Sequence, residues 1–195
     1  MKKFSLVLFI SQLCLSITFM ASFIVDAKQE ESLSPTTIQG SVVKLNDSTG
    51  LVYVGMEIPK KNLQPYLLQL KAILGEQQYK LFRANQIKRD EKGFHLTLIN
   101  PFEYQKLVKD KKAILLGQQI TVKLQGLGTV AETANDINKK VKTEQAQTYF
   151  VIISSADGEK YRQHYALKAK DFHSTLGFNP HDIYTKSKGL ERLVK

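Results

Sequence analysis

The chain has 195 residues, enough for one ordinary domain, and its hydrophobic fraction of 43% and charged fraction of 24% exclude an intrinsically disordered protein. The formal net charge of +10 suits a phosphate-bearing ligand, a nucleic acid or an anionic surface, although the same charge also serves solubility. The single cysteine, Cys14, lies in the apolar N-terminal stretch, which excludes a disulfide, a thiolate zinc site and a cysteine nucleophile from the rest of the chain.

The N-terminus has the layout of a secretory signal peptide. Two lysines precede an apolar run that extends to Val25, and small residues occupy the −3 and −1 positions of a cleavage site after Ala27. We therefore expect residues 1–27 to be a signal peptide and the protein to be exported, either to a periplasm or out of the cell. The apolar run is longer than an ordinary signal core, so an uncleaved anchor in contact with a membrane is the alternative interpretation.

The domain that follows is expected to span residues 39–195, after a polar, flexible leader at 28–38. In its first part, Asn62 and Gly75 are expected to begin and end a helix whose leucines recur at helical spacing. Strands are expected on both sides of this helix, from their apolar runs and from the turn residues between them. The expected strands are residues 40–45, 50–58, 78–85 and 94–99.

The second part of the domain follows a similar order. Strands come first, then a helix that Asp157 caps and that carries His164 on its apolar face, and then a last strand. The polar stretch 132–147 is expected to be an exposed loop. The expected strands are residues 118–130, 148–153 and 171–178. This weak internal repeat predicts an α+β fold in two lobes of a single domain, at about 39–112 and 113–195.

The phrase Phe-His-x-Thr-Leu occurs twice, once in each half of the domain. Because successive side chains of a strand point to opposite faces, His95 and Thr97 share one face while the apolar residues take the other. His173 and Thr175 share a face in the second copy in the same way. One such pair alone is more typical of a core histidine bonded to a threonine, but two copies in matching context favour a functional site.

If a pseudo-two-fold axis relates the lobes, the two strands meet near the axis and the four polar side chains converge on one groove. Convergent donors in a basic protein form a cradle for a phosphate or another oxyanion. Two imidazoles also form an acid and base couple without a metal, since an unperturbed histidine titrates near pH ~6.5 and a neutral and a protonated ring coexist near neutral pH. This division of labour suits chemistry on a phosphodiester.

Two His-x-Thr motifs about eighty residues apart, each on an expected strand, resemble the 2H phosphoesterase superfamily. The stretch that begins at Phe172 resembles in particular the Swiss Army Knife branch, because Asp182 with Ile183 and Lys188 with Gly189 follow the second motif. The resemblance implies a bilobal α+β fold, with two antiparallel sheets around a central cleft and helices on the outside. It also implies a metal-independent phosphodiesterase that acts on 2′,3′-cyclic or 2′,5′-linked phosphodiesters of nucleotides or RNA ends.

Carried over by position, the resemblance makes His95 and His173 the acid and base pair, and it makes Thr97 and Thr175 the residues that hold the phosphate. Which histidine is the acid and which is the base is left open. Further candidates for substrate contact each have a plainer alternative, as a surface lysine or as core residues. They are Lys188, Arg83 on the strand expected before the first motif, and the aromatic residues Phe178, Tyr53 and Tyr149.

The alternative function is an exported binding protein that holds a nucleotide or another anionic ligand in the same cleft without turnover. No cofactor and no metal are expected, because metalloprotein spacing is missing and a site built from His95, His173 and Asp182 is disfavoured. No double-stranded DNA motif is recognised, and a monomer is expected. Arg89 is expected in a charged turn, and His181 is expected on the surface.

Overall fold

The structure is a computed structural model and describes residues 34–91, 93–132 and 145–194. The predicted signal peptide and most of the predicted leader lie outside these described residues, as does most of the predicted loop at 132–147. No helix within the described ranges is both long and apolar enough to cross a membrane.

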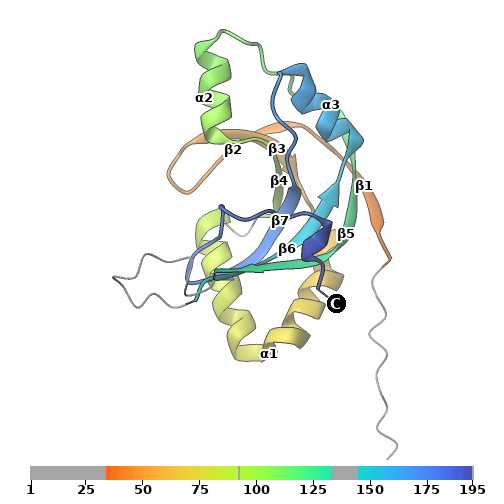
Figure 1. Ribbon diagram of the computed structural model, residues 1–195, viewed down its shortest axis with the longest axis vertical. Coiled ribbons are helices and arrows are strands. Elements are labelled where there is room, and N and C mark those ends of the chain that lie inside the picture. The colour runs from red at the N-terminus through yellow and green to blue at the C-terminus, as the bar shows by residue number, and fades with distance from the viewer. Residues whose placement is uncertain (1–33, 92, 133–144, 195) are drawn as a thin grey trace, which may run out of the picture. The chain divides into compact units, whose positions relative to one another are not determined.

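A four-stranded antiparallel sheet carries the second His-x-Thr motif (Figure 1). Its strands are β1 (Thr36–Ser41), β5 (Gln119–Ala131), β6 (Gln147–Ser154) and β7 (Phe172–Asn179). They lie in the order β1-β5-β6-β7, so β7 is an edge strand. Strand β6 has two neighbours and is buried along nearly its whole length, as its continuous apolar run predicts.

A three-stranded antiparallel sheet carries the first motif and consists of β2 (Val43–Asn46), β3 (Val52–Glu57) and β4 (His95–Ile99), in that order. The predicted turn between β2 and β3 is confirmed, and the Asp47 carboxylate closes it by accepting a hydrogen bond from the backbone N–H of Thr49 at 2.8 Å. Strands β4 and β7 are both edge strands, and they contact each other. The two sheets of this α+β fold therefore meet at the two strands that carry the repeated motif.

Helix α1 (Lys60–Asp90) takes the place of one predicted strand. The expected helix end at Gly75 is a bend, where a φ of 71° interrupts the helix before it continues. The predicted strand at 78–85 is wrong, because these residues continue the helix and bury Phe82 against β7. Gly177 of β7 permits this approach, since a Cβ added there would lie 3.0 Å from the Cβ of Phe82. Packing on the sheet overrides the local strand-like pattern.

Helix α2 (Pro101–Lys109) follows β4 directly and is absent from the elements expected above. Its start is a capping box in which the Asn100 side chain and the Glu103 carboxylate each accept a hydrogen bond from the other residue's backbone N–H, both at 2.9 Å. The sequence does carry this signal, as an Asn followed by a Pro and, three residues after the Asn, by a Glu. The first turn of α2 therefore lies beside the end of the first motif strand.

Helix α3 (Ala156–His164) lies between β6 and β7 in the chain. Ser155 caps it through its hydroxyl, whereas the expected cap, Asp157, lies in the first turn. His164 is exposed at the end of the helix, so its predicted place on a buried face is wrong. The buried residues of this helix are instead Gly158, Tyr161 and Arg162.

Two elements of the first predicted lobe contact the sheet of the second lobe. Strand β1, from the first half of the chain, pairs with β5 of the four-stranded sheet, and α1 packs on β7. Buried side chains of both sheets and of α1 form one hydrophobic cluster. Because β1 begins at Thr36, the last residues of the predicted leader at 28–38 belong to the sheet. A division between residues 112 and 113 therefore does not separate the two sheets.

Candidate active site

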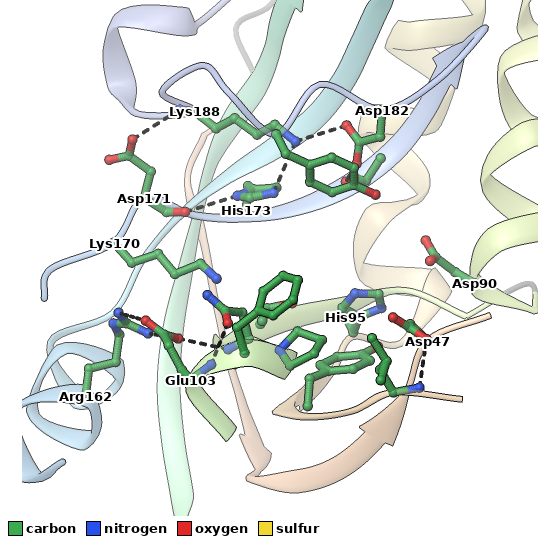
Figure 2. Close-up of a pocket in the computed structure, with 18 of the residues that line it drawn as sticks. Asp47, Asp90, His95, Glu103, Arg162, Lys170, Asp171, His173, Asp182 and Lys188 are labelled. Atoms are coloured by element: carbon green, nitrogen blue, oxygen red, sulfur yellow. Dashed lines mark hydrogen bonds and ion pairs between the residues drawn. The ribbon is translucent and has the colours of Figure 1, made fainter. Parts of the chain in front are cut away.

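A cleft of about 680 Å³ lies where β4 and β7 meet. Both motifs line it, with His95 and Thr97 on β4 and with His173 and Thr175 on β7. The residues that alternate with them on β4 are buried in the core, which is the division of faces that strand alternation predicts. The structure thus brings to one cleft the four side chains that the repeated phrase singles out. Figure 2 shows the two histidines among the residues that line it.

His95 lies beside Tyr53, with the two ring centroids 5.0 Å apart. Its pKa is below the ordinary histidine value, chiefly because burial disfavours the charged ring. The nearby Asp90 carboxylate opposes this effect and raises the pKa, whereas the charges of Arg89 and Lys170 lower it. Within the described residues neither ring nitrogen of His95 has a hydrogen-bond partner, so its tautomer is not fixed by a neighbour.

The ring of His173 has more contacts than the ring of His95. Its Nδ1 lies 3.0 Å from the backbone carbonyl oxygen of Asp171, and since a carbonyl only accepts, Nδ1 carries the proton. The other ring nitrogen, Nε2, then offers a lone pair, 3.4 Å from the Nζ of Lys188. Burial lowers the pKa of His173, and the positive charge of Lys188 lowers it further.

The lowered pKa values correct one expectation about the pair. Both His95 and His173 favour the neutral form near neutral pH, so neither ring is the protonated partner that an unperturbed histidine would supply. An anionic phosphate placed between the rings favours the charged form of each. A bound phosphate would therefore favour protonation of either ring.

Asp182, in the segment after β7, contacts three residues around the second motif, and Figure 2 shows its contact with Lys188. One carboxylate oxygen lies 3.1 Å from the Nζ of Lys188, which is only 3% exposed. The other oxygen accepts a hydrogen bond from the guanidinium of Arg89 and, at 3.5 Å, from the hydroxyl of Thr175. Burial alone would raise the pKa of Asp182, but the charges of Lys188 and Arg89 hold it below the ordinary value. The carboxylate therefore fixes two cations beside His173.

The disfavoured metal site considered above would be built from His95, His173 and Asp182. In the part of the chain that the structure describes, no group of three or more His, Cys, Asp or Glu side chains is placed to hold a metal ion. The carboxylate of Asp182, which that alternative required, is bonded to Lys188 and Arg89 instead.

The structure places Lys188 and Tyr53 in the cleft, but three other expected substrate contacts, Arg83, Phe178 and Tyr149, do not line it. Arg83 belongs to α1 and not to a strand, and its buried guanidinium donates to the backbone carbonyl of Leu176. Phe178 is buried with the guanidinium of Arg89 over its ring, 4.9 Å from the centroid. Neither Arg83 nor Phe178 lines the cleft, so both serve the packing around it.

Several residues of the cleft are not expected from the sequence. Arg89 lies in the last turn of α1, not in a turn between strands, and reaches Asp182. Arg162 of α3 pairs with Glu103 of α2 at 2.8 Å, and the capping box is the signal that places Glu103 there. Lys170, between α3 and β7, also lines the cleft, and no periodic pattern in the sequence marks it.

Comparison with known proteins agrees with the paired motifs. Residues 53–184 match the sequence model of the family described as Swiss Army Knife, 2H phosphoesterase domain. The match includes both His-x-Thr pairs and Asp182, and the family comprises hydrolytic phosphoesterases. No curated protein and no solved structure matches the chain. With the match over most of its length and both motifs in one cleft, the chain belongs to the Swiss Army Knife 2H phosphoesterase family.

Proposed function

We propose that this phosphoesterase hydrolyses 2′,3′-cyclic or 2′,5′-linked phosphodiesters of nucleotides or RNA ends without a metal. The meeting of two His-x-Thr pairs in one cleft is the observation that carries the proposal. The hydroxyl of Thr97 would donate a hydrogen bond to a phosphate oxygen, and the hydroxyl of Thr175 would do the same once it turns away from Asp182, to which it donates at 3.5 Å. The ammonium of Lys188 would neutralise charge beside them. The substrate class is the one that the resemblance to the 2H phosphoesterase superfamily implies.

The surroundings of the two histidines favour different roles. His173 has its proton on Nδ1 and a lone pair on Nε2, so we assign it as the base that takes a proton from the attacking water. His95 lies near the Asp90 carboxylate, which favours its protonated form, so we assign it as the acid that protonates the leaving ribose oxygen. The bond from phosphorus to that oxygen breaks as the bond to the water oxygen forms, and the product is a phosphate monoester.

A substrate panel tests this function. The purified protein is incubated with a chelator and with 2′,3′-cyclic and 3′,5′-cyclic nucleotides and 2′,5′- and 3′,5′-linked dinucleotides, and the products are identified by mass spectrometry. We expect turnover of the 2′,3′-cyclic or 2′,5′-linked compounds, unchanged by the chelator, because imidazoles carry the protons. Turnover restricted to the 3′,5′ compounds, or abolished by the chelator, would contradict the proposal.

The pH dependence follows from the lowered pKa values of His95 and His173. One ring must be neutral and the other protonated, so kcat/KM is expected to follow a bell whose limbs report the two pKa values of the free enzyme. Because both values lie below that of an ordinary histidine, the maximum is expected on the acidic side of pH ~6.5. Initial rates below saturation, measured across the acidic and neutral range, give this profile. A maximum clearly on the alkaline side of neutrality would contradict the assignment.

A binding protein without turnover is the second candidate. The observation in its favour is the ammonium of Lys188, which lies 3.4 Å from Nε2 of His173 and so occupies the lone pair that a base requires. For the enzyme, the phosphate must draw this ammonium away from the ring. Saturable nucleotide binding with no product in the substrate panel would favour the binding protein.

A further inference from the structure

The cleft continues past the two histidines toward the segment between α3 and β7 (Figure 2). Lys170, from that segment, extends its ammonium into the cleft between His173 and the ion pair that Arg162 forms with Glu103. Phe102, which is 75% exposed on the first turn of α2, lines the cleft as well. The cleft thus offers a cation and an apolar ring that the proposed chemistry does not use.

Lys170 differs from Lys188, Arg89 and Arg162 in its lack of a direct counter-ion. Lys188 and Arg89 share the carboxylate of Asp182, and Arg162 is paired with a carboxylate of α2 at 2.8 Å. The described residues offer the ammonium of Lys170 no ion pair and no hydrogen bond. A partly buried ammonium with no such partner is suited to bind an anion.

Burial lowers the pKa of Lys170 to about 8, so the side chain is still largely protonated at neutral pH. The charged groups that face it are Glu103 of α2, which raises the pKa, and Arg162 of α3 and Lys188 of the C-terminal segment, which lower it. The Lys170 charge in turn lowers the pKa of both motif histidines. A ligand held at the histidines therefore lies within the electrostatic reach of Lys170.

The scissile phosphate does not require Lys170, because Thr97, Thr175 and Lys188 already place two hydroxyls and an ammonium beside the histidines. We propose that Lys170 binds a second anionic group of the substrate, a terminal phosphate monoester on the same nucleotide or RNA end. This inference rests on the function proposed above and narrows it to phosphodiesters that carry an additional phosphate.

The affinities of two product analogues, one with and one without a second phosphate, test this subsite without requiring turnover. Isothermal titration calorimetry near neutral pH compares a nucleoside 3′-monophosphate with the corresponding 3′,5′-bisphosphate. We expect the parent protein to bind the bisphosphate at least about tenfold more tightly, which is the effect of one charge-assisted contact. In Lys170→Gln this ratio is expected to fall to near one, whereas Lys170→Arg keeps the charge and most of the ratio.

Lys160→Gln is the matched control, because Lys160 carries the same charge, is exposed on α3 and does not line the cleft. This variant is expected to keep the ratio of the parent protein. The ratio of the parent is also expected to fall as the pH is raised from neutral through the pKa of Lys170 at about 8, because the ammonium then loses its proton. The phosphate monoester, with its second pKa at ~6, is already fully ionised in that range.

A parallel turnover assay separates two kinds of failure, with 2′,3′-cyclic nucleotides that carry or lack a 5′-phosphate as substrates. If neither is hydrolysed but the affinity ratio depends on Lys170, the proposed reaction fails and the second subsite stands. If both are hydrolysed but the parent binds the two products equally, the subsite is overturned and the reaction stands. The subsite is also overturned if Lys170→Gln weakens the binding of both products equally, because Lys170 would then serve the scissile phosphate.

Discussion

Replacing either His95 or His173 by alanine is expected to lower kcat for a nucleoside 2′,3′-cyclic phosphate by about 10²- to 10⁴-fold, the range that a positioned acid or base contributes. Each ring supplies one of the two proton transfers, and no other imidazole among the described residues lines the cleft. The fold is expected to survive, because both side chains extend into the cleft while alternate residues of β4 and β7 fill the core. Product formation and far-ultraviolet circular dichroism measure the two effects.

His164→Ala is the matched control for these variants. His164 is exposed at the end of α3 and does not line the cleft, so its removal is expected to leave kcat unchanged. Parental activity in either His95→Ala or His173→Ala would contradict the acid and base assignment. An equal loss in His164→Ala would show that the measured effect is not specific to the cleft.

Replacing Asp182 by alanine is expected to lower the free energy of unfolding by about 3–5 kcal/mol, the range for breaking a buried ion pair by removal of one partner. The loss is large because Lys188, 3% exposed, keeps its charge without the carboxylate that compensates it, and Arg89 loses one of its two acidic partners. Urea unfolding at neutral pH measures the difference between the parent protein and the variant.

Glu76→Ala provides the comparison, because Glu76 also pairs with two cations but does so on the exposed surface of α1. Its carboxylate lies 2.7 Å from the Nζ of Lys71 and 3.1 Å from that of Lys80, and because solvent screens these pairs its loss is expected to change the free energy of unfolding far less than the loss of Asp182. Similar losses for Glu76→Ala and Asp182→Ala would contradict the role given to burial.

The contribution of Asp182 to the free energy of unfolding is also expected to depend on pH. Its pKa in the folded protein lies below the ordinary aspartate value, so its stabilising contribution is present above the pKa of the unfolded chain. That contribution is lost as the pH falls through the lowered pKa of the folded state. The difference in unfolding free energy between the parent and Asp182→Ala is therefore expected to shrink in acid.

The features of the site that depend on local backbone geometry are largely predictable from the sequence. Strand alternation alone assigns His95 and Thr97 to one face of β4 and the apolar residues to the other, and the structure has this division. The repetition of the phrase then indicates that two such faces meet. Local turn and capping chemistry is informative as well, since the sequence marks both the Asp47 turn and the Asn100 capping box, although only the turn is among the expected elements.

What cannot be predicted depends on contacts between distant parts of the chain. The stretch 78–85 is helical because it packs over Gly177, ninety or so residues further on, and no local pattern reports that neighbour. The same helix carries Arg89 to Asp182. The depressed pKa values of both histidines likewise arise from burial and from the charges around the cleft, which exist only once the sheets have met.

The central claim is that His95 and His173 act as a unit on one phosphodiester, and a double-mutant cycle tests it most directly. The rate of 2′,3′-cyclic nucleotide hydrolysis is measured for the parent, for His95→Ala and His173→Ala, and for the double variant, with chelator present. Residues that act as a unit are strongly non-additive, so the double variant is expected to be about as slow as the slower single variant. A double variant that hydrolyses the substrate as fast as the parent, or losses that multiply as independent effects, would contradict the claim.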